Sequence, residues 1–183
     1  MTNCIRTASG VLFNPLEPDF ETFDLNVIAH ALSHICRFTG HTRTFYSVAQ
    51  HSVIVAELLA DQYTAAHGLY GLLHDASEAY IADVSRPVKH HPSMRPYRDL
   101  EARLQAAIYR SFGLSAEEPE MVKAIDTFVL DVEMRDLMEG ADPVHRIRAS
   151  VHPPIVPMDS ELACLAFLRC FSDLHPRLVA EGV

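Results

Sequence analysis

The 183-residue sequence lacks the features that mark several common classes of protein. No apolar run approaches the roughly 20 residues that a membrane-spanning helix needs. The first ten residues, MTNCIRTASG, lack the apolar core of a signal peptide. The four cysteines show neither CxxC spacing nor a ladder of pairs, which is typical of proteins in a reducing cytoplasm. We therefore expect a cytoplasmic protein with no membrane span and no structural disulfide.

Positive charge is also scarce, because 15 Lys and Arg residues face 24 Asp and Glu residues, for a net charge of −9. This balance argues against binding to the backbone of a nucleic acid polymer. It leaves room for a small anionic substrate, since a local group of Arg, Lys or metal can reverse the field inside a pocket. The sequence has eleven histidines, and histidine is the commonest metal ligand in proteins.

Strand-like alternation and internal repeats are absent as well, and helical spacing of apolar residues runs through most of the chain. The sequence predicts a single all-α domain over residues 1–183, a bundle of about six main helices. Residues 1–22 are predicted to form an irregular or short extended arm, and residues 140–158 a long Pro-rich loop. Ser47 and Gln50 have the spacing of a capping box. The helices are predicted from Asp24 to about residue 35, from Ser47 to Leu59, from about Thr64 to Ala82, from about Tyr97 to Phe112, from Pro119 to Glu139 and from Asp159 to about Leu174.

Polar groups interrupt the apolar faces of three of these helices. His51 lies on the inward face of one helix, His74 and Asp75 continue the apolar face of the next, and Asp126 lies at the edge of a third. One such group is more often a hydrogen-bonded core residue than a ligand. Two His and two Asp from three helices, however, are a set that Zn, Mn or Fe accepts. The spacing alone leaves a metal site and a polar core as open alternatives.

The order H…HD…D, formed by His51, His74–Asp75 and Asp126, resembles the HD-domain phosphohydrolase superfamily, which is all-α. The resemblance is greatest to its small nucleotidase branch, which holds the bacterial 5′-deoxynucleotidases and the phage deoxynucleoside triphosphohydrolases, including dATP-degrading enzymes. It covers about residues 28–136, most of the domain.

Three segments carry this resemblance. Residues 74–89, HDASEAYIADVSRPVK, are similar to the HDASE…GD…P.K signature of the branch, and residues 46–52, YSVAQHS, to its VAEHS segment. Arg37-Phe38 falls where the branch has an Arg-Trp pair. The sequence departs from the pattern at Phe38, in a spacing to His51 that is one residue shorter, and at Ala82, which stands where the branch has Gly. These departures bear on base and sugar selectivity.

The resemblance implies that His51, His74, Asp75 and Asp126 ligate one divalent ion, which is Zn, Co, Mn, Mg or Fe. It implies that Glu78 orients or deprotonates the attacking water. Asp83 matches a second acid that protonates the leaving 5′-oxygen or holds a water that does so. The alternatives are an exposed helix glutamate for Glu78 and a helix cap for Asp83.

The resemblance also implies a set of substrate contacts. Arg37 fits a phosphate-clamping arginine, because a guanidinium pairs bidentately with phosphate oxygens. Phe38 would pack on the deoxyribose or the base, or else lie in the core. Lys89 would meet phosphate, or else lie on the surface. His41 and Arg43 belong to the same loop as Arg37 and would reach the phosphates.

The reaction we expect is hydrolysis of the bond between the α-phosphorus and the 5′-oxygen of a 2′-deoxynucleotide. Basic residues in the 37–43 segment favour a triphosphate substrate, which would yield deoxynucleoside and tripolyphosphate. The resemblance to the family implies a preference for dATP. The alternatives are a 5′-deoxynucleotidase acting on monophosphates, a phosphodiesterase acting on a cyclic or signalling nucleotide, and a non-catalytic binding module. Relatives assemble as dimers or hexamers, so a homo-oligomer is expected. Arg146 and Arg148 would serve a polyphosphate tail, a subunit contact or a solvated loop.

Overall fold

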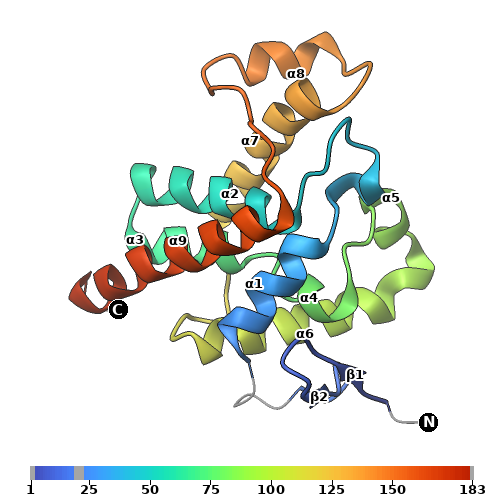
Figure 1. The fold of residues 1–183 in the computed structure, drawn as a ribbon, viewed down its shortest axis with the longest axis vertical. Helices are drawn as coiled ribbons and strands as arrows, with labels where there is room; N and C mark the ends of the chain where they lie inside the picture. The colour runs from blue at the N-terminus through green and yellow to red at the C-terminus, as the bar shows by residue number, and fades with distance from the viewer. Residues whose placement is uncertain (1–2, 19–22, 182–183) are drawn as a thin grey trace.

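The computed structural model describes residues 3–18 and 23–181, and its fold is all-α, as predicted. Figure 1 shows α7 and α8 reaching one end of the molecule and a small β-hairpin at the opposite end. No helix within the described ranges is long and apolar enough to cross a membrane. The six longest described helices are α1 (Leu25–His34), α2 (Val48–Gln62), α3 (Ala65–Leu73), α6 (Arg95–Ser111), α7 (Glu120–Leu137) and α9 (Ser160–Glu181). The shorter ones are η1 (Arg37–Gly40), α4 (Glu78–Ile81), α5 (Arg86–Lys89), η2 (Pro92–Met94) and α8 (Pro143–Arg148).

The N-terminal arm contains a two-stranded antiparallel hairpin, β1 (Ile5–Arg6) and β2 (Leu12–Phe13). Strands of two residues are too short to produce a visible alternation, which is why the sequence did not predict them. Phe13 anchors the hairpin, because its ring is buried and lies 4.4 Å from the ring of Tyr80. The remainder of the predicted arm, residues 1–2 and 19–22, lies outside the described residues.

Two predicted helix starts are confirmed, one of them only in part. The Asp24 carboxylate accepts a hydrogen bond from the Asn26 N–H, and the Ser47 hydroxyl accepts one from the Gln50 N–H. The Gln50 side chain does not return to Ser47 as a capping box requires. It donates instead to the Val156 carbonyl and accepts from the Met158 N–H, both at 2.8 Å, and so fastens a distant segment to α2.

Close packing of α2 on α3 places the two halves of the candidate site side by side. Helix α2 lies at the centre of the bundle and contacts α1, α3, α7 and α9. A Cβ added at Gly71 would lie only 2.6 Å from a Leu59 methyl, and one at Gly68 only 2.9 Å from the Ala60 methyl. Both α3 glycines therefore permit a helix approach that a larger side chain would prevent. This approach sets His51 of α2 beside the C-terminal end of α3.

Three predicted boundaries are wrong. The helix predicted from about Thr64 to Ala82 ends at Leu73, and after a turn α4 begins at Glu78. The predicted 140–158 loop contains α8, because Pro143 favours a first helical turn and the Asp142 carboxylate caps it through the Val144 N–H. Helix α9 continues to Glu181 instead of stopping near residue 174. Pro176 lies inside α9 without ending it.

Candidate metal centre

Three of the four predicted ligands, His51, His74 and Asp126, bring ligand atoms within 4.8 Å of one another inside the bundle, and Asp75 lies beside this group without belonging to it. His51 Nε2 lies 3.3 Å from His74 Nε2, 3.2 Å from Asp126 Oδ1 and 3.7 Å from Asp75 Oδ2. His74 Nε2 lies 3.3 Å from Asp75 Oδ2 and 3.9 Å from Asp126 Oδ1. Ligand atoms about 2.0–2.2 Å from a tetrahedral ion lie about 3.3–3.6 Å apart. The spacing and chemistry of His51, His74 and Asp126 therefore suit one divalent ion, and Asp75 lies at the edge of this group.

Hydrogen bonds fix which nitrogen of each histidine faces the centre. His51 Nδ1 lies 2.7 Å from Glu133 Oε1, and His74 Nδ1 lies 2.7 Å from the Gly71 carbonyl oxygen. Both partners are acceptors, so each Nδ1 carries the proton that it donates. In the neutral rings each Nε2 then presents a lone pair, and the two lone pairs face each other beside two carboxylates. This arrangement calls for a cation between them.

The electrostatics of the site agree with that reading. Burial and the Arg37 guanidinium lower the pKa of His51, but Glu133 and Asp126 outweigh them and raise it to about 9. Burial raises the pKa of Asp126, but the hydrogen bond and charge of His51 outweigh it and hold that pKa far below its usual range. The potential at His51 Nε2 is therefore strongly negative and attracts a positive charge, either a proton or a metal ion.

Glu133 is a member of the site to which the sequence assigned no role. Its side chain is fully buried and joins His51 to Arg37, whose Nη2 lies 3.1 Å from Glu133 Oε2. Burial raises the pKa of Glu133, but Arg37 and His51 outweigh it and keep the carboxylate charged. Arg37 Nη1 also reaches Asp75 at 3.4 Å. Glu133 lies seven residues after Asp126, hence on the same face of α7, and that spacing is the signal that could have identified it.

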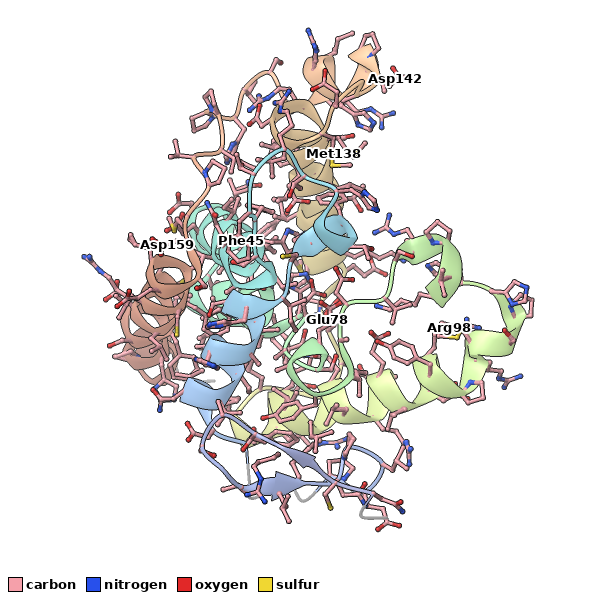
Figure 2. The ribbon with its side chains drawn as sticks, turned by 45° about the vertical axis from the view of Figure 1, so that its right-hand side comes forward. Phe45, Glu78, Arg98, Met138, Asp142 and Asp159 are labelled. Atoms are coloured by element: carbon pink, nitrogen blue, oxygen red, sulfur yellow. The ribbon has the colours of Figure 1, made fainter. Side chains whose placement is uncertain are left out.

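Glu78 is buried and incompletely paired, so the alternative of an exposed helix glutamate is wrong. Its side chain is 4 % exposed and lies near the middle of the molecule, between α1 and α6 (Figure 2). Its Oε2 is buried without a hydrogen-bond partner among the described residues, and its Oε1 lies 3.9 Å from Lys89 Nζ. Burial, followed by Asp75 and Asp83, raises the pKa of Glu78 well above its usual value. A carboxyl tuned upward in this way suits a general base.

A cavity of about 720 Å³ opens over these groups. This volume lies in the range of small-molecule sites. We call the inner groups the floor; Asp75, Glu78 and Asp126 line the cavity there, and the adjoining His51, His74 and Glu133 do not line it but complete the floor. We call the outer lining the rim; it consists of Phe38, Thr39 and His41 on one side and of Arg86, Lys89 and His90 on the other.

The backbone of the rim and its approach contains unusual conformations. Phe38 and Thr39 have φ values of 53° and 54°, and Gly40 follows with 79°. Ala82, just after α4, has φ 68° and ψ 157°, a region that is populated almost only by Gly. This conformation turns the chain out of α4 so that Asp83 lines the cavity. Ala82 stands where the related signature has Gly, so the departure noted in the sequence coincides with a strained position.

The predicted substrate contacts divide into two groups. Arg37, Phe38, His41, Lys89 and the predicted acid Asp83 line the cavity. Lys89 forms an ion pair with Glu101, with 2.7 Å between Nζ and Oε1. Burial is the main cause that raises the pKa of Asp83 above its usual value.

Arg43 does not line the cavity. Its N–H donates to the Leu137 carbonyl, and its guanidinium donates to the Asp136 carbonyl and pairs with Glu139 at 3.5 Å. Arg43 therefore fastens the loop to the C-terminal end of α7 instead of facing a substrate.

Two cationic candidates that the sequence left unassigned, Arg86 and His90, do line the cavity. Arg86 is the first residue of α5 and His90 directly follows its last residue. Arg86 Nη2 lies 3.8 Å from Asp126 Oδ2. The RPVK segment that carries Arg86 was visible in the sequence, but only its Lys was assigned. Arg146 and Arg148 lie on α8 and are exposed, and neither lines the cavity.

Fold and site together define an all-α protein with a candidate divalent metal centre beneath a cavity lined by both acidic and basic side chains. Comparison with known proteins adds its family. The chain is 35% identical over 176 residues to the uncharacterized protein YfdR of Escherichia coli. The alignment covers 93% of this chain and 94% of that protein. It is also 35% identical over 141 residues to the uncharacterized protein RCAP_rcc00048 of Rhodobacter capsulatus, over 72% of this chain and 71% of that protein. The chain belongs to the family of these proteins. No family model matches the sequence.

Proposed function

We propose that this protein is a divalent-metal-dependent phosphohydrolase that cleaves the bond between the α-phosphorus and the 5′-oxygen of a 2′-deoxynucleotide. The observation that carries the proposal is the pair of histidines whose protons are fixed on Nδ1, so that both Nε2 atoms face Asp75 and Asp126. The reaction class comes from the resemblance of residues 74–89 to the HD-domain nucleotidases. The incompletely paired carboxyl of Glu78, whose Oε2 has no hydrogen-bond partner among the described residues, favours catalysis over a purely binding role.

Each group has a distinct task in this hydrolysis. His51, His74 and Asp126, with Asp75 beside them, would hold a divalent ion, which when bound would lower the pKa of a water and offset charge on a phosphate oxygen. Glu78 accepts the proton that the water loses as its oxygen attacks the α-phosphorus. The bond to the 5′-oxygen breaks, and Asp83, which lines the cavity, gives that oxygen its proton. Arg37, held by Glu133 and Asp75, aims its guanidinium into the cavity and pairs with phosphate oxygens.

Two substrate sizes fit different observations. The cavity volume and the additional cation Arg86 favour a triphosphate, with dATP as the preferred substrate and tripolyphosphate as a product. Ion pairs that already occupy Arg37 and Lys89 leave less free positive charge, which favours a monophosphate as the second candidate.

The experiment that tests the function incubates the purified protein with a panel of dNMPs and dNTPs plus Mg²⁺, Mn²⁺, Co²⁺ or Zn²⁺. We expect deoxynucleoside together with either phosphate or tripolyphosphate. Release of pyrophosphate would contradict cleavage at the 5′-oxygen, and absence of any hydrolysis over the whole panel would contradict the proposed function.

A pair of aspartate variants ties this activity to the centre. Asp75→Ala should lose bound metal and all turnover. Asp61→Asn, an exposed change on the same helix as His51, is the control and should keep both. Hydrolysis that survives Asp75→Ala would show that the metal centre is not the catalytic site.

A further inference from the structure

A side chain from α6 interrupts the hydrogen-bond pattern at the end of α3. In a continuous helix the Ser77 N–H would donate to the Leu73 carbonyl, four residues earlier. Here the Ser77 N–H donates to Gln105 Oε1 at 3.0 Å, and Gln105 Nε2 donates to the Leu73 carbonyl at 2.6 Å. The amide of Gln105 is thus inserted into the place of one helical hydrogen bond and satisfies both of its ends. Insertion of a side chain into this ladder is a recognised cause of a helix break.

The break between α3 and α4 lies at the candidate site, because residues 74–77 form the turn between the two helices. Helix α3 stops at Leu73, a turn covers residues 74–77, and α4 starts at Glu78. Within the turn the bonds span three residues, since the Ala76 N–H donates to the Leu73 carbonyl and the Glu78 N–H to the Asp75 carbonyl. His74 and Asp75 lie inside the turn, and their facing atoms are 3.3 Å apart.

We propose that Gln105 is a positioning residue: its inserted amide holds the 74–77 turn open and so sets His74 and Asp75 as ligands and Glu78 over the cavity. This inference rests on the metal centre of the proposed function. Gln105 itself is part-buried and does not line the cavity, so it acts only through the turn.

Neighbouring residues on α6 support a positioning role for this helix. Tyr97, Glu101 and Gln105 are spaced by four and therefore share one face. The Tyr97 hydroxyl donates to the Ala82 carbonyl at 2.8 Å, and Glu101 pairs with Lys89. One face of α6 thus contacts the 74–89 segment at three places. These are the turn at its beginning, Ala82 just before Asp83, and Lys89 at its end.

Gln105→Met tests the inference, because methionine has the same length but no amide. Mn²⁺ binding is measured by calorimetry and unfolding by chemical denaturation. Loss of an outer partner of a metal ligand typically weakens binding about 10–100-fold, and we expect a loss of about this size. Gln50→Met is the matched control: Gln50 also bridges two backbone groups, Val156 and Met158, and should lose stability with little change in Mn²⁺ affinity.

The outcomes separate the inference from the function on which it rests. Equal Mn²⁺ affinity in wild type and Gln105→Met would overturn the positioning role while leaving the metal centre intact. A wild-type protein that binds no Mn²⁺ would overturn the centre itself, and the inference with it. If Gln105→Met does not fold, Gln105→Glu keeps the acceptor for Ser77 and removes the donor to Leu73. An unchanged Mn²⁺ affinity in that variant would equally overturn the role.

Discussion

The floor and the rim of the cavity are built on different physical principles. In the floor, side chains such as His51, His74 and Glu133 are held by short hydrogen bonds and by close helix packing. In the rim, Arg86 and His90 are exposed, and Phe38 and Thr39 adopt left-handed backbone conformations. Rigid burial suits groups that must keep a metal geometry. Exposed basic side chains suit the recognition of a particular phosphate chain, so we assign chemistry to the floor and substrate choice to the rim.

Among changes in the floor that leave the proposed metal ligands in place, Glu78→Gln has the largest expected effect on rate. Removing a general base typically lowers turnover about 10²–10⁴-fold, and we expect a loss in that range with bound metal unchanged. Steady-state kinetics and elemental analysis of the metal content check this. Turnover within a few-fold of wild type would show that the floor does not hold the base.

Although Glu78→Gln should lower turnover, we expect it to raise the stability of the fold. Because burial raises the pKa of Glu78 above its ordinary value of 4.5, the folded protein holds this proton more tightly than the unfolded chain. The wild type therefore loses stability as the pH rises from about that value, and the glutamine variant escapes this loss. Denaturation in EDTA should show a stability gain for Glu78→Gln that grows between acidic and neutral pH.

Arg86→Ala probes the rim and should leave the floor intact. We expect the KM for a triphosphate to rise about 10-fold, which corresponds to about 1.4 kcal/mol, with kcat and the KM for a monophosphate nearly unchanged. Arg103→Ala, an exposed change on α6, is the control. An equal rise for both substrates would contradict a role in reading the phosphate chain.

Ala82→Gly tests the strained joint between floor and rim and has the smallest expected effect. An alanine in this conformation destabilises the fold by on the order of 1–3 kcal/mol. Glycine removes this strain but loses about 0.5–1 kcal/mol through its larger chain entropy in the unfolded state, so we expect the free energy of unfolding to rise by about 1 kcal/mol. Ala102→Gly, an exposed position within α6, should instead lose about 1 kcal/mol. Chemical denaturation measures the free energy of unfolding of both variants. A lower value than wild type in both would contradict backbone strain at Ala82.

The difference between floor and rim also explains how much the sequence could predict. The helices and their inward faces follow from periodicity, which directed His51, His74 and Asp126 to the interior but left a metal site and a polar core as alternatives. The choice of a metal site came from the family resemblance. The break after Leu73 was not predictable, because it depends on Gln105, which lies 32 residues beyond Leu73 in the sequence. Local propensity contains no signal for a side chain inserted from another helix.

Residues of the rim were harder to predict for a related reason. A basic residue in a loop faces the cavity only if the backbone turns it inward. Arg43 and Arg86 illustrate this, since both lie in segments with a basic character and only Arg86 lines the cavity. Left-handed conformations at Phe38 and Thr39 decide the course of their loop, and neither residue type favours them. Side-chain direction in the rim therefore required the structure.

The most direct test of the metal centre is the anomalous scattering of crystals grown with Mn²⁺. We expect one strong peak per chain in the anomalous difference density. It should lie about 2.0–2.3 Å from His51 Nε2, His74 Nε2 and an oxygen each of Asp75 and Asp126. A peak elsewhere, or none between these four side chains, would contradict the central claim that the floor is a metal site.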